Sequence, residues 1–175
     1  MGIAFNSSER STIGVEWELQ LVDERTRHLR QEAPKLLSEL PELSSETSAS
    51  PLRHELMQSQ VEVVTGICET VEEARNDLSG NIGRMREVLL PWGSTLTCSG
   101  THPIDDWRDQ EISPGKRYGE LVEQMQWLAR RILTCGVHVH VGVRDRDKAI
   151  PMVDALTMYL PHFLALPASS PRWGG

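Results

Sequence analysis

Residues 12–22, with the sequence TIGVEWELQLV, decide the fold of this chain. Apolar and polar side chains alternate from Thr12 to Leu21, and a β-strand places successive side chains on opposite faces. The segment is therefore predicted to be a strand with two different faces. The apolar face carries Ile13, Val15, Trp17, Leu19 and Leu21, and the other face carries Gly14, Glu16, Glu18 and Gln20.

A second alternating segment lies far along the chain, at residues 134–143 (TCGVHVHVGV). Its valines, Val137, Val139 and Val141, share one face, and His138 and His140 share the other. Residues 53–65 (RHELMQSQVEVVT) also have a strand-like pattern. Three segments are therefore expected in one sheet, and each carries ionisable groups opposite an apolar face.

Helical spacing alternates with these strands. Thr70 and Glu73 form a capping box before an amphipathic helix predicted at 71–90, and a second one is predicted at 117–132. A third begins near Asp147, and the apolar stretch 150–168 is predicted to be a mostly buried helix that ends or kinks near Pro161. We expect an α+β fold with a mainly antiparallel sheet. Helices should cover its apolar face, valines included, and leave the polar face open.

Composition limits the class of protein. The 175 residues carry a net charge of −7, and a nucleic-acid partner usually requires a basic surface. Three widely spaced cysteines form no zinc or disulfide pattern, and the polar N-terminus lacks the apolar core of a signal peptide. We therefore expect a cytoplasmic protein that binds neither nucleic acid nor membrane.

The ionisable residues on the strands predict a metal site. Glu16 with Glu18, and His138 with His140, share faces, whereas Glu55 and Glu62 are seven residues apart and share a face only across a bulge or strand start. Carboxylates with one or two imidazoles suit Mg²⁺ or Mn²⁺ better than zinc. Taken singly, such glutamates are more often solvated or paired with a basic residue. The sequence also lacks a P-loop and a G-x-G-x-x-G motif, so ATP phosphates would need metal ions and positive side chains.

Five stretches resemble the type 2 glutamate–cysteine ligases, also described as carboxylate–amine ligases. They are GVEWELQLVD (14–23), HELMQSQVEVVTG (54–66), GTHPIDDW (100–107), RYGELVEQMQWLARRILTCGVHVHVGV (117–143) and LALPASSPRW (164–173). The resemblance implies a glutamine synthetase-like catalytic domain, whose concave sheet face binds ATP and metal. Residues 1–10 would be a disordered N-terminus, and residues 11–175 the N-terminal part of that domain, truncated because family members are about twice as long.

By this resemblance, the Mg²⁺ (or Mn²⁺) ligands are Glu16, Glu18, Glu55, Glu62 and His138, and His140 approaches the ATP phosphates. Arg117 corresponds to a substrate or phosphate contact, although a surface arginine at a helix start is an equal interpretation. The implied reaction joins glutamate to cysteine, or to another amine, through an acyl phosphate, as in glutathione biosynthesis. A homodimer is a further expectation. Two alternatives remain: a metal-dependent hydrolase that uses the histidine strand, and a truncated, inactive relative.

Overall fold

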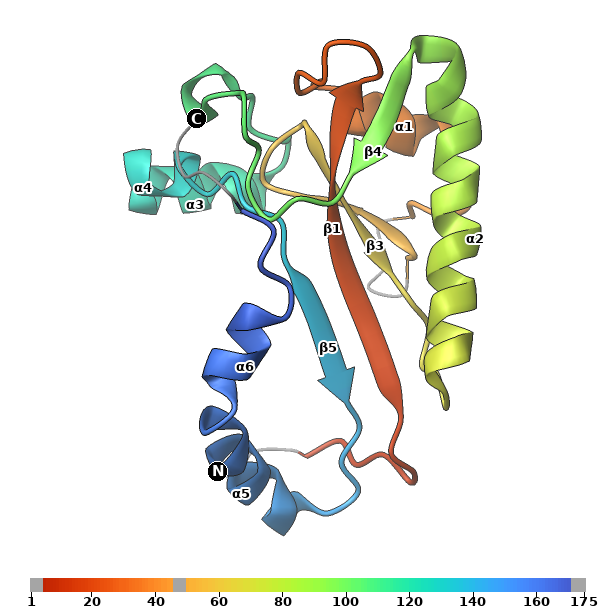
Figure 1. Ribbon diagram of the computed structural model, residues 1–175, viewed down its shortest axis with the longest axis vertical. Coiled ribbons are helices and arrows are strands. Elements are labelled where there is room, and N and C mark those ends of the chain that lie inside the picture. The colour runs from red at the N-terminus through yellow and green to blue at the C-terminus, as the bar shows by residue number, and fades with distance from the viewer. Residues whose placement is uncertain (1–4, 46–49, 171–175) are drawn as a thin grey trace.

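A computed structural model describes residues 5–45 and 50–170 of the chain. Its centre is the long strand β1 (Ile13–Asp23), which pairs antiparallel with β3 (Gln60–Val64) along one edge. Along the other edge, β5 (Val137–Val141) pairs with the first half of β1 and β4 (Ser94–Thr97) with the second half. The short strand β2 (Leu52–His54) pairs with β3. The α+β prediction with an antiparallel sheet is confirmed (Figure 1).

The apolar face of β1 is covered by α2 (Val71–Leu89), which runs along the sheet beside β3, β1 and β4 (Figure 1). The predicted cap is present, because the Thr70 hydroxyl accepts a hydrogen bond from the Glu73 amide at 3.1 Å. Met85 and Leu89 of α2 are fully buried. They pack in one core with Leu19 and Leu21 of β1 and with the short helix α1 (Ala33–Glu39). This layer holds the central strand in place.

Residues 53–65 are not one strand, as their pattern suggested, but a hairpin of β2 and β3. In its register Arg53 lies opposite Glu62, and His54 lies opposite Val61. Paired positions therefore sum to 115, so an odd-numbered residue of the first arm shares a face with an even-numbered residue of the second. Glu55 directly follows β2 and shares the face of Glu62 by this rule. The spacing problem that the sequence presented is thus removed by the turn.

The segment predicted as one helix at 117–132 is divided into α3 (Lys116–Met125) and α4 (Trp127–Arg130). The division falls at Gln126, whose backbone φ of 52° cannot continue an α-helix. Towards the end of the chain, α5 (Arg146–Thr157) and α6 (Leu160–Ala165) separate just before Pro161, close to the predicted break. The part of the chain that the structure describes contains no helix long and apolar enough to cross a membrane.

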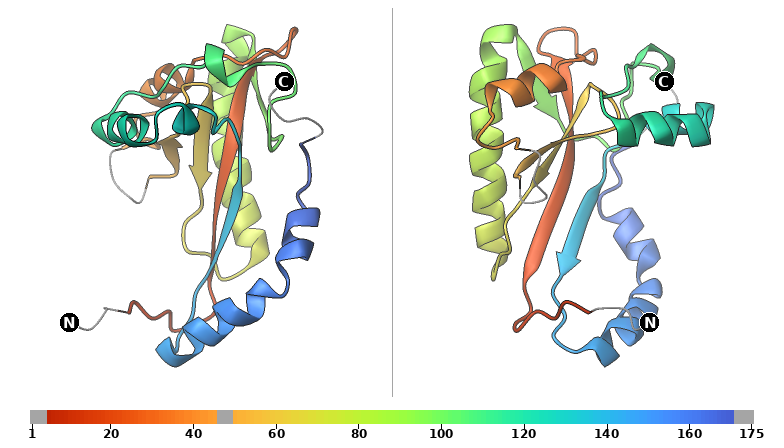
Figure 2. Two further views of the ribbon diagram at one scale, coloured as in Figure 1. Left: turned by 90° about the vertical axis from the view of Figure 1, so that its left-hand side faces the viewer. Right: turned by 180° about the vertical axis from the view of Figure 1, so that it is seen from behind.

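Two burial predictions are wrong. Every residue from Pro151 to Ala165 is exposed, although the apolar stretch was expected to be buried. Val137, Val139 and Val141 are 51%, 61% and 54% exposed. The reason is visible in Figures 1 and 2: α2 covers β1, β3 and β4, α3 and α4 lie beyond one end of β5, and no described element covers its valine face. Contiguous exposed apolar side chains of this kind are typical of surfaces that contact another protein, a membrane or a ligand.

Of the expected disordered N-terminus, residues 5–10 lack regular secondary structure, and the Ser8 amide donates a 3.1 Å hydrogen bond to the Val143 carbonyl. Residues 1–4 lie outside the described residues, as do the last three of the similar stretch at 164–173.

Truncating one buried and one exposed valine of the sheet to alanine tests which of the two positions is packed against other residues. Val61→Ala, at a fully buried position, should lower the free energy of unfolding by about 2 kcal/mol, because two buried methyl groups are lost and a cavity remains. Val139→Ala, on the uncovered face, should cost less than about 0.5 kcal/mol. Urea denaturation of the two variants measures both values. Equal losses would mean that the valine face of β5 is covered in solution.

Candidate metal and nucleotide site

The polar face of the sheet is assembled by strand register. Glu16 of β1 lies directly opposite His138 of β5, and Glu18 lies opposite Glu62 of β3. Directly paired residues in antiparallel strands have their side chains on the same face. Strand pairing therefore places Glu16, Glu18, Glu62 and His138 on one face, as the sequence predicted.

Three carboxylates converge most closely on this face. One oxygen each from Glu18, Glu55 and Glu62 lies within 4.8 Å of the others. They come from β1, from the turn after β2 and from β3. Glu18 is also held by the Gly136 amide, which donates a 2.8 Å hydrogen bond to its Oε2 atom. Carboxylate oxygens in such a group match the ligand preference of Mg²⁺ and Mn²⁺, so these residues fit a hard divalent cation.

The histidines form a separate group around Glu16. His138 Nδ1 and His140 Nε2 each lie 3.3 Å from Glu16 Oε2. Burial raises the pKa of the Glu16 carboxyl, but hydrogen bonds to His140 and His138, with the charge of Arg53, bring it below its usual value. Among the described residues, three potential ligand atoms converge within 4.8 Å only in the glutamate trio, which contains no histidine. This arrangement disfavours a histidine-based hydrolase site.

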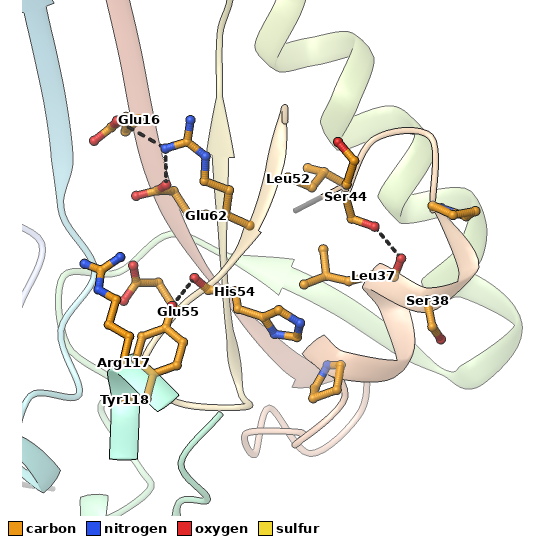
Figure 3. A pocket seen from close by; sticks show the side chains of 14 residues that line it. Glu16, Leu37, Ser38, Ser44, Leu52, His54, Glu55, Glu62, Arg117 and Tyr118 are labelled. Carbon is orange, nitrogen blue, oxygen red and sulfur yellow. Dashed lines mark hydrogen bonds and ion pairs between the residues drawn. The ribbon is translucent and has the colours of Figure 1, made fainter. Parts of the chain in front are cut away.

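Arg53 connects the two groups and was missed by the sequence analysis. Its Nη1 atom lies 3.3 Å from Glu62 Oε1 and 3.6 Å from Glu16 Oε1 (Figure 3). β2 is only three residues long, so a period of two was hard to recognise there. The only available signal was the alternation of Leu52, Arg53 and His54, which places an arginine on the polar face once the hairpin is known.

A cavity of about 940 Å³ wraps around the β2 edge of the sheet beside this cluster. Its wall includes Glu55, Arg53 and Glu62 together with Arg117 and Tyr118 from the first turn of α3 (Figure 3). The Tyr118 hydroxyl donates a 2.6 Å hydrogen bond to the His54 carbonyl and so ties α3 to β2. Burial, with the charge of Glu55, raises the pKa of Tyr118 to about 12, so it remains a donor. Arg117 is exposed but faces the cavity, beside Glu55.

The acidic cluster is electrostatically costly. Burial raises the pKa of Glu55, and the charges of Glu18 and Glu62 raise it further against the amide of Leu56 and the charge of Arg117. Burial likewise raises the pKa of Glu62. The charges of Glu16 and Glu18 raise it further, and the charge of Arg53 lowers it. Carboxylates whose mutual repulsion is relieved by a cation are typical of metal and catalytic sites.

Cys135 lies close to this cluster but is not a nucleophile. Burial raises the pKa of its thiol to about 12, and the charges of Glu18 and Glu55 act in the same direction. The thiolate is the reactive form of cysteine. The thiol instead accepts a hydrogen bond from the Gln60 side-chain amide at 3.1 Å, which is a structural role.

The repulsion within the trio predicts a pH effect in metal-free protein. The folded-state pKa of Glu55 lies above the ordinary 4.5, so the folded state binds protons more tightly and loses stability as pH rises through that interval. Glu55→Gln removes this loss. Its stability advantage over wild type should be small near pH 4.5, grow as the pH rises above that value and then level off. Urea denaturation in EDTA measures it.

The matched control is Glu24→Gln, at an exposed turn position, which should run parallel to wild type across the same pH range. If Glu55→Gln also runs parallel, then Glu55 does not lie among the other carboxylates in solution.

Known proteins show the family to which the chain is related. The profile of glutamate–cysteine ligase family 2 (GCS2) matches residues 12–175. A protein of Thermobifida fusca (strain YX) named "Putative glutamate–cysteine ligase 2" is 68% identical over 175 residues, which cover 100% of this chain and 44% of that protein. A Frankia casuarinae relative named "Putative glutamate–cysteine ligase 2-1" is 54% identical, over 100% of this chain and 46% of its own. The chain thus spans less than half the length of these relatives.

The fold also resembles a solved structure, that of a bifunctional glutathione synthetase from Pasteurella multocida. The TM-score is 0.51 at 14% sequence identity, over 86% of this chain and 19% of that one. At this identity the likeness concerns the fold alone. The match of the family profile to nearly the whole chain, and the high identity to its named relatives, establish that the chain belongs to glutamate–cysteine ligase family 2.

Proposed function

We propose that this chain supplies the metal- and nucleotide-binding face of an ATP-dependent carboxylate–amine ligase that forms γ-glutamylcysteine. The observation that carries the proposal is the convergence of Glu18, Glu55 and Glu62 within 4.8 Å from three separate segments. A solvated sheet edge has no need to bring three acids together in partly buried positions. Family membership supplies the reaction class.

Glu18, Glu55 and Glu62 would hold Mg²⁺ or Mn²⁺, with Glu16 and His138 at the adjoining position. When bound, such a cation neutralises charge on the phosphates of ATP and on the transferring phosphoryl group. The residues of the chain contribute position and charge. Glu16 fixes both histidines on the face, and His140 and Arg117 are the side chains that would contact phosphate or substrate oxygens.

The reaction would proceed in two displacements. A γ-carboxylate oxygen of glutamate attacks the γ-phosphorus of ATP, so that ADP leaves and an acyl phosphate forms. The amine of cysteine then attacks the acyl carbon, phosphate leaves, and the amine proton is lost to solvent or a base. Neither step requires a covalent bond to the protein. The rate therefore depends on alignment and on electrostatic stabilisation.

Neutralising one trio member tests the site. Glu18→Gln keeps the shape of the side chain but removes a charged ligand, so Mg²⁺ affinity should fall about tenfold or more. Calorimetric titration of the 175-residue chain with MgCl₂, and then with ATP at saturating Mg²⁺, measures the change. Glu24→Gln, at the exposed turn, is the control and should bind like wild type.

The identity of the proposed substrates is tested by analysing the reaction products. The assay uses a wild-type protein that also contains the additional segment found in the longer relatives. Incubated with ATP, glutamate and cysteine, it should form ADP, phosphate and γ-glutamylcysteine, which mass spectrometry detects. EDTA should abolish all three. The proposal fails if wild type and Glu18→Gln bind Mg²⁺ equally, or if phosphate is released without the dipeptide.

A further inference from the structure

We propose that Arg53 is a built-in counter-cation of the carboxylate site. Its guanidinium neutralises Glu16 and Glu62 while no divalent cation is bound, and it gives up these carboxylates when a cation binds. Binding of a divalent cation would thus replace the Arg53 guanidinium as the positive group beside these carboxylates. This inference rests on the proposed metal site but concerns a residue that the proposed function leaves without a role.

The first argument is geometric. A single guanidinium nitrogen lies 3.3 Å from Glu62 and 3.6 Å from Glu16, so Arg53 spans the boundary between the glutamate trio and the histidine pair. Glu62 belongs to both sets, since it is also within 4.8 Å of Glu18 and Glu55. The Arg53 side chain would therefore compete for the Glu62 carboxylate with any cation that the trio holds.

The second argument concerns charge. Four glutamates, Glu16, Glu18, Glu55 and Glu62, gather on this face, and the Glu62 side chain is only 12% exposed. Water screens a group in such a position poorly, so a nearby positive charge is needed. Arg53 is the basic side chain that contacts two of the four. Arg117 acts on Glu55 from the cavity side, and the two histidines contact Glu16 alone among them.

The third argument is that the Arg53 side chain has open space beside it into which it can rotate. Its side chain is 31% exposed and forms part of the wall of the 940 Å³ cavity. A guanidinium displaced from Glu62 can therefore turn into solvent-filled space without entering the core. A lysine in the same place would carry the same charge, so the exchange depends on charge more than on hydrogen-bond geometry.

The test is the effect of Arg53 on metal affinity. Arg53→Gln removes a positive charge that lies 3.3 Å from a carboxylate of the trio, so MgCl₂ should bind about tenfold more tightly by calorimetry. The metal-free variant should also unfold at a lower temperature than wild type, and saturating MgCl₂ should remove most of that difference. Arg53→Lys keeps the charge and should bind MgCl₂ within about threefold of wild type.

Arg30 offers a matched control. It also joins two carboxylates, Asp23 at 3.3 Å and Glu32 at 2.6 Å, and its side chain is 36% exposed, but it lies away from the cluster. Arg30→Gln should lower the unfolding temperature equally with and without MgCl₂ and leave the affinity unchanged. A merely structural role for Arg53 would give this same pattern.

A measurement on wild type covers the case in which Arg53→Gln does not fold. In protein labelled with ¹⁵N-arginine, MgCl₂ should shift the Arg53 Nε–H signal and speed its exchange with water, while the Arg30 signal stays in place. Arg53→Lys assigns the signal by its loss. Unchanged or weaker Mg²⁺ binding by Arg53→Gln, or an unmoved Arg53 signal, overturns the inference alone. Absence of Mg²⁺ binding by wild type overturns it together with the proposed function.

Discussion

The register of β1 is the constraint on which the rest of the structure depends. Leu19 and Leu21, with Trp17 against them, pack in the core under α2, and Glu16 and Glu18 lie on the other face. A shift of one residue would place Glu16 and Glu18 in the apolar layer and Leu19 and Leu21 in water, which no strand pairing could offset. The hydrophobic core therefore fixes the positions of the acids. Because the stretches of β1 that pair with β3 and with β5 overlap at Glu16 and Trp17, the polar residues of all three strands reach the same place.

Strand pairing of this kind holds several glutamate side chains close together, where their negative charges repel one another. Burial and neighbouring charges raise the pKa values of Glu55 and Glu62, while the core prevents the strands from moving apart. Relief has to come from a positive group, and two sources are compatible with the geometry: the guanidinium of Arg53 from within the chain and a divalent cation from outside. The same rigidity that makes the site unfavourable when uncompensated would favour a compact cation over a larger one.

Period-two and period-3.6 patterns predicted β1, β5 and α2, because each is long and has one side packed or one side polar. The hairpin at 52–64 was missed because its turn, between His54 and Gln60, contains no glycine or proline and continues the apolar spacing through Leu56 and Met57. Local patterns show which face of a strand is apolar, but not what covers it. The valines of β5 demonstrate this, since their alternation is as regular as that of β1 and yet they are exposed. Arg53 could be recognised as a site residue only from the tertiary pairing.

Exposure changes steadily across the polar face, and this gives the site a direction. The side chains of Glu62 and Glu16 are 12% and 24% exposed, whereas those of His138 and His140 are 58% and 64% exposed. The carboxylates are thus the less exposed groups of this face, although Glu55 and Glu62 also line the 940 Å³ cavity. The histidines are the more exposed groups, so a group as large as a triphosphate would have room beside them as well. Because β5 is paired with β1 on one side only within the described chain, the histidine end of the face coincides with the uncovered part of the sheet. The exposed valines of β5 lie on the opposite face of that strand, so covering them would leave the histidines open.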